Sequence, residues 1–85
     1  MPYISKEDRK ELNSLTELIE KTQIKTPGEL NYLLTILCQN FLKQNGENYS
    51  NHNSIVGVLD CAKLEWYRRR ISEYEDKKIL ENGDV

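Results

Sequence analysis

The sequence predicts an all-α fold: a three-helix antiparallel hairpin-like unit whose long C-terminal helix can kink, assembling into a helical oligomer. Three observations support this prediction. Apolar residues recur every three or four positions in three segments, helix start and stop signals bracket those segments, and no segment alternates polar and apolar residues as a strand would. We expect a single all-α domain that covers residues 1–85.

The first helix is expected to begin at Ser5, because its hydroxyl can accept a free backbone N–H and Asp8 follows at the spacing of a capping box. An apolar face follows at helical spacing and comprises Leu12, Leu15, Leu18 and Ile19. The remaining positions are polar, which is typical of a helix on a surface. The helix should end in the polar stretch 21–25.

The second helix has the clearest start signal, with Thr26 as N-cap, Pro27 at the first helical position and Glu29 at the third. Asn45 and Gly46 should end it, because Gly tolerates the left-handed conformation. Its apolar stripe is wider than a single packing partner requires and comprises Leu30, Leu33, Leu34, Leu37, Cys38 and Phe41.

The third helix should be capped by Ser50 or Asn51. It is apolar on two sides: one contains Ile55, Val58, Leu59, Ala62 and Trp66, and the other contains Val56, Leu64, Tyr67, Ile71 and Tyr74. Gly57 is interpreted as a point where another helix approaches closely. Ser72 and Glu75 repeat the capping-box spacing, so the helix is expected to bend or restart at Ser72 before it ends at 82–83.

Composition limits the possible functions. A chain of 85 residues without disulfides buries little surface by itself, so self-association is expected. The net charge of −2 argues against binding to DNA or RNA polymers, which requires a basic surface. No segment is apolar enough for a membrane span, and we expect a soluble protein inside a cell. Cys38 and Cys61 are expected to be reduced and buried, and His52 to be solvated.

An aromatic and cationic cluster stands out in the last third of the chain. Within fifteen residues it contains the only Trp, two of the five Tyr and five cations: Trp66, Tyr67, Arg68, Arg69, Arg70, Tyr74, Lys77 and Lys78. Cations suit a phosphate and aromatic rings suit a flat base, so the mixture favours a phosphorylated aromatic ligand. Solvated arginines paired with neighbouring acids are the alternative interpretation.

Helix geometry limits how this cluster can be used. Successive positions differ by about 100°, so at most two of the three arginines can face one ligand. Tyr67 and Tyr74 are seven positions apart and are expected to share a face, whereas Trp66 is expected to face the core. Catalysis, a metal site and a cofactor are not predicted, because the chain has no phosphate-binding Gly loop and only one His.

Several short motifs in order resemble a family of small bacteriophage proteins, and the resemblance covers nearly the whole chain. The motifs are Pro2-Tyr3-Ile4 with Glu7-Asp8-Arg9, then 27–32 (Pro-Gly-Glu-Leu-Asn-Tyr), then 56–59 (Val-Gly-Val-Leu) with Lys63, Glu65 and Tyr67-Arg68-Arg69, and finally 74–79 (Tyr-Glu-Asp-Lys-Lys-Ile) with 82–85 (Asn-Gly-Asp-Val). The family is similar to anti-CBASS sponges, tetramers that sequester cyclic dinucleotides such as 3′3′-cGAMP without cleaving them.

This resemblance implies a phage immune-evasion protein in the cytoplasm of the infected bacterium. It would bind a cyclic dinucleotide as a homotetramer and thereby block activation of CBASS effectors. The residues assigned to the ligand are Arg68, Arg69 and Lys77 for phosphate, Tyr67 and Tyr74 for stacking, and Asn31 and Asn82 for base edges or ribose. The chain departs from the pattern in having Glu73 where relatives often have Pro, and in lacking the Tyr that often follows the final Val in relatives.

Two other functions remain open. A small helical interaction protein could bind and inhibit a host protein through its apolar surface, with Trp66, Tyr67 and Arg68 as anchors. Binding of single-stranded nucleic acid by the same segment would show a steep dependence on salt, and the acidic remainder of the chain argues against it.

Overall fold

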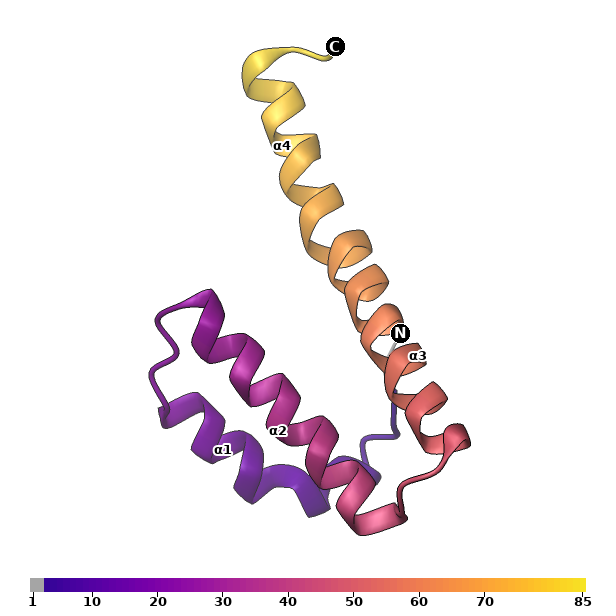
Figure 1. Cartoon of the computed structure of the whole chain (residues 1–85). Coiled ribbons are helices and arrows are strands. Elements are labelled where there is room, and N and C mark those ends of the chain that lie inside the picture. Colours follow the sequence, from indigo (N-terminus) through magenta and orange to yellow (C-terminus); the bar gives the residue numbers. More distant parts are fainter. Residues whose placement is uncertain (1–2) are drawn as a thin grey trace. The chain divides into compact units, whose positions relative to one another are not determined.

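The computed structural model describes residues 3–85 and confirms the all-α fold (Figure 1). Pro2 of the first resemblance motif lies outside the described residues. The elements are the 3₁₀ helix η1 (Asp8–Leu12), α1 (Asn13–Lys21), α2 (Pro27–Asn45), α3 (Tyr49–Trp66), the π-helix η2 (Tyr67–Ile71) and α4 (Ser72–Asn82). Residues 3–85 contain no strand.

The chain divides into two compact units, Met1–Asn40 and Phe41–Val85, with the boundary inside α2. In the first unit α2 begins as its capping signal predicts, but the helix expected from Ser5 does not: a 3₁₀ helix begins at Asp8, and α1 begins only at Asn13. The Asp8 N–H donates to the Ser5 hydroxyl at 3.1 Å, and the Glu29 N–H donates to the Thr26 hydroxyl at 3.1 Å. α1 ends at Lys21, where the polar stretch begins. Side-chain capping therefore explains the start of α2, whereas neither η1 nor α1 has a side-chain cap at its N-cap residue.

The second unit begins inside α2 and contains a tight turn between α2 and α3. Gly46, with φ 101°, ends α2 in the left-handed region as predicted. The cap of α3 is Asn48, and the prediction of Ser50 or Asn51 was wrong: the Asn48 side chain accepts the Asn51 N–H at 2.7 Å. Asn51 serves the preceding helix, because its amide donates to the carbonyl oxygens of Asn45 and Gly46 at 3.3 and 2.8 Å.

α3, η2 and α4 follow one another as a single helical run of 18, 5 and 11 residues. Ser72 does begin α4, but its backbone is helical (φ −59°, ψ −42°) and its side chain caps nothing. The predicted capping box was therefore wrong. A π-helical turn stands in its place, in which the Ser72 N–H donates to the carbonyl oxygen of Tyr67, five residues earlier.

No side chain among residues 3–85 is buried, so neither unit has a hydrophobic core. This finding corrects three expectations. Cys38 is half-buried and Cys61 is exposed; Trp66 is 62% exposed and does not lie in a core; and a Cβ at Gly57 would meet nothing within 4 Å. The predicted close approach at Gly57 does not occur within the described chain.

Candidate ligand-binding helix

Two arginines of η2 are held by one carboxylate from the last turn of α3. The Arg68 Nη2 donates to both oxygens of Glu65, at 3.0 and 3.1 Å, and the Arg69 Nε pairs with the same carboxylate. Arg68 therefore keeps Nε and Nη1 for another acceptor, and Arg69 keeps both terminal nitrogens. The arginines are oriented by Glu65 and still retain donors for an oxyanion.

Two cations lie over aromatic rings on the same helical run. The guanidinium carbon of Arg70 is 5.6 Å from the centre of the Trp66 ring, and the Lys78 Nζ is 5.5 Å from the centre of the Tyr74 ring. Both distances lie within the range of cation–π attraction. Because Trp66 and Tyr74 are 62% and 61% exposed, each has ring surface left for another flat group.

The π-helical turn changes which residues share a face. In a regular α-helix Tyr67 and Tyr74 would be aligned, but the wide turn adds one residue and displaces Tyr74 by about 100°. The Tyr67 hydroxyl reaches Glu75 instead, eight residues away, at 3.4 Å. The expected shared face of Tyr67 and Tyr74 was therefore wrong, although both rings stay exposed on the helix.

The predicted ligand residues fall into two groups. Tyr67, Arg68, Arg69, Tyr74 and Lys77 lie within eleven consecutive positions of η2 and α4, and Asn82 is the last residue of α4, before Gly83 (φ 85°). Lys77 forms no ion pair among residues 3–85. Asn31 belongs to α2 in the other unit. The structure thus brings together five of the seven predicted residues on one helix, with Asn82 at its end.

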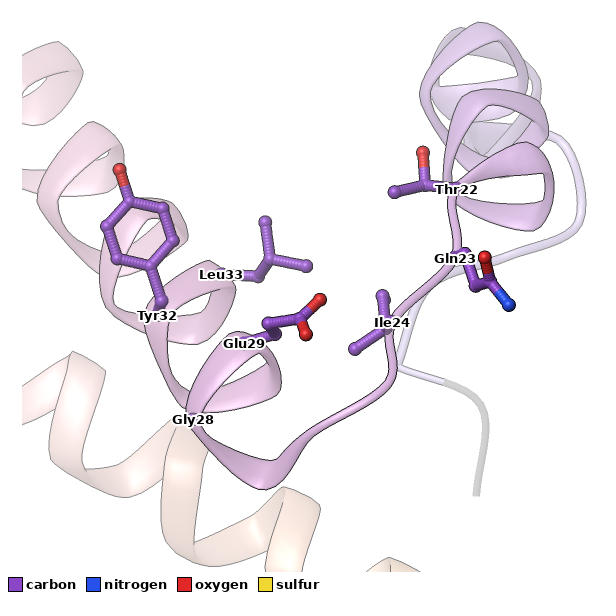
Figure 2. A pocket seen from close by; sticks show the side chains of 7 residues that line it. All are labelled: Thr22, Gln23, Ile24, Gly28, Glu29, Tyr32 and Leu33. Carbon is purple, nitrogen blue, oxygen red and sulfur yellow. The ribbon is translucent and has the colours of Figure 1, made fainter.

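The first unit contains a groove of about 370 Å³ that sequence reasoning did not identify (Figure 2). It lies between the segment that follows α1 and the first turns of α2, and it is lined by Thr22, Gln23, Ile24, Gly28, Glu29, Tyr32 and Leu33. Figure 2 shows Ile24 and Leu33 on opposite sides of this space. Asn31 does not line the groove. The Thr26–Glu29 cap was the available signal, because it fixes the turn that brings the two sides together.

The described residues contain no cluster of three His, Cys, Asp or Glu side chains arranged to hold a metal ion. Across the same residues, no helix is both long and apolar enough to cross a membrane.

Comparison with known proteins gives a family but no function. No curated protein matches the chain, and no solved structure matches it. A family model described as a domain of unknown function, DUF6899, matches residues 1–85. Because that match spans the whole sequence, the chain belongs to the DUF6899 family.

Proposed function

We propose that this protein is a phage-encoded sponge that binds a cyclic dinucleotide, such as 3′3′-cGAMP, at a subunit interface of a homo-oligomer, expected to be a tetramer. It would hold the messenger intact in the cytoplasm of the infected bacterium and so prevent activation of CBASS effectors. Binding alone would suffice, so no catalytic residue is assigned.

One observation carries this proposal: oriented arginines and exposed aromatic rings occur together along η2 and α4. Glu65 holds Arg68 and Arg69 while leaving them N–H donors, and Tyr67 and Tyr74 are 49% and 61% exposed. Guanidinium donors suit phosphate oxygens, and exposed rings suit purine faces. Lys77 supplies a further cation for phosphate.

The lack of a core among residues 3–85 supports an interface site. A ligand bound to one isolated helix would remain largely in water, whereas ligand sites normally enclose most of the ligand surface. A symmetric dinucleotide also suits a two-fold axis, because each half then meets the same residues from a different subunit. Asn31 and Asn82 would contact base edges or ribose in such an assembly.

Isothermal titration with 3′3′-cGAMP, followed by heat denaturation and nucleotide analysis, tests the proposal. Heat of binding with intact nucleotide recovered is expected. Arg69→Ala and Tyr74→Ala should each weaken binding by about tenfold or more, because each removes a ligand contact.

Matched controls come from exposed residues elsewhere: Arg9→Ala for the arginine and Tyr49→Ala for the tyrosine. Binding that is unchanged in Arg69→Ala and Tyr74→Ala would disprove the site. Absence of heat with a panel of cyclic nucleotides would disprove the function.

A second candidate function is inhibition of a host protein by direct binding. The many large apolar side chains that stay exposed on α2 and α3 favour it, since such surface normally meets a protein partner. Stoichiometric capture of one host protein, lost in Trp66→Ala and with no nucleotide retained on the purified chain, would support this function over the sponge.

A further inference from the structure

The second half of the long helical run lies beyond the reach of α2. α2 has 19 residues and is about 28 Å long, whereas the run from α3 through α4 is about 50 Å long. Only residues 46–48 separate the two. Even if α2 packed along α3 over its full length, it would end near Tyr67, so α2 cannot cover η2 and α4.

Large side chains are nevertheless exposed along this uncovered part. Trp66, Tyr67 and Tyr74 each expose about half of their surface or more, and Ile71 between them is only half-buried. Aromatic side chains of this kind dominate the energetics of protein interfaces. The uncovered part therefore has the residue types of a contact surface.

The charges are ordered around Ile71. Arg68, Arg69 and Arg70 precede it closely, and three acids follow it closely: Glu73, Glu75 and Asp76. When two copies of such a helix lie antiparallel, with a two-fold axis at Ile71, the arginine-rich half of each copy lies alongside the acidic half of the other. A parallel arrangement would instead place like charges together.

These acids are available for such pairing. Glu73, Glu75 and Asp76 form no ion pair within residues 3–85, and neither does Arg70. In a regular α-helix Arg69 and Glu73 would be neighbours at the i, i+4 spacing. Within residues 3–85, the arginines before Ile71 therefore form no ion pairs with the acids after it.

We propose that two copies of the chain pair antiparallel through η2 and α4, about a two-fold axis at Ile71, with the arginine side of one helix against the acidic side of the other. The occupant of the uncovered surface is a second copy, because one segment supplies both complementary halves of the interface. The pairing needs no nucleotide, so its test is independent of the proposed function.

Complementary charge reversal tests the pairing. Glu73→Arg/Glu75→Arg makes both sides of Ile71 basic, and Arg68→Glu/Arg70→Glu makes both sides acidic. By sedimentation, each variant alone should self-associate at least about tenfold more weakly than the parent, because like charges would meet. An equimolar mixture of the two variants should restore a dimer that contains one copy of each.

The matched control is Glu17→Arg/Glu20→Arg, which reverses two exposed acids on α1 and should leave self-association unchanged. If either reversed variant self-associates as tightly as the parent, or if the mixture fails to form the mixed dimer, the proposal is wrong. A parent protein that is monomeric at all concentrations would also overturn it.

A cross-linking measurement keeps the proposal testable if the reversed variants fail to fold. At the 8–10 Å separation of packed helix axes, residues on the two-fold axis bring their Cα atoms within disulfide range. Ile71→Cys, in a background of Cys38→Ser/Cys61→Ser, should therefore oxidise to a covalent dimer. Glu17→Cys in the same background is the control. No excess of cross-linked dimer at position 71 over the control would overturn the proposed axis.

Discussion

Asn48 shows how closely a helix start depends on one side chain. Its carboxamide oxygen accepts the Asn51 N–H at 2.7 Å and so satisfies a donor at the first turn of α3. Asn48→Ala should therefore lower the free energy of unfolding by about 1 kcal/mol. Ser50→Ala is the matched control and should change it little, although the sequence had offered Ser50 as the cap. Thermal denaturation followed by circular dichroism measures both, and an equal loss in the two variants would contradict this assignment.

Gly57 gives a second prediction at the residue scale. A Gly inside a helix costs about 1 kcal/mol relative to Ala, and a Cβ at position 57 would meet nothing within 4 Å in the chain. Gly57→Ala should therefore raise the midpoint of thermal unfolding. If the midpoint falls instead, another molecule approaches Gly57 closely in solution, as the sequence first suggested.

Residue-scale features were predictable where they depend on near neighbours. Thr26 and Gly46 act as their sequence context indicated, because a cap or a left-handed stop involves only the adjacent turn. The cap of α3 was misplaced by two or three residues because Asn48, Ser50 and Asn51 are all good caps, and the sequence does not show which one the turn selects.

At the scale of elements, η2 was the main feature that the sequence did not reveal. A π-helical turn forms from the same residue types as an α-helical one, so no residue in 67–71 marks it. The capping-box spacing correctly predicted that the helix changes at Ser72, but the change is a π-helical turn and not a capped restart. For the candidate site, the sequence predicts which residues lie along η2 and α4, but the directions of their side chains depend on the wide turn.

Removing one residue from η2 should convert it to a regular α-helix. Deletion of Arg70 is expected to keep the helix content measured by circular dichroism while weakening self-association, because Tyr74 and Glu75 rotate by about 100° relative to Tyr67. Arg70→Ala preserves the length of the helix and serves as the control. Self-association that weakens equally in the two variants would show that the loss comes from the arginine and not from the register.

At the scale of the whole molecule, stability follows from the lack of buried side chains among the residues that the structure describes. A chain whose described residues have no core gains little from burial by itself, so folding should be coupled to assembly. The midpoint of thermal unfolding should therefore rise with protein concentration over a range of about 100-fold. A midpoint that stays constant over that range would mean that a single chain is stable alone.

Periodicity did predict that the helices carry wide apolar stripes, but it did not show what covers them. Leu33 and Phe41 follow the expected helical spacing and yet remain exposed at 36% and 39%. The same spacing serves an intrachain core and a subunit interface equally well. The expected burial of Trp66 and Cys61 was wrong because it assumed that the apolar stripes pack into an intrachain core.

The turn between α2 and α3 has a consequence for folding kinetics. Its hydrogen bonds, from Asn51 to the carbonyl oxygens of Asn45 and Gly46 and from the Asn51 N–H to Asn48, join residues no more than six positions apart. Such short closures are fast, since little chain entropy is lost. Refolding should thus begin with a rapid first-order phase in which this turn forms. A slower phase, second order in protein, should follow as chains meet and cover their apolar surfaces.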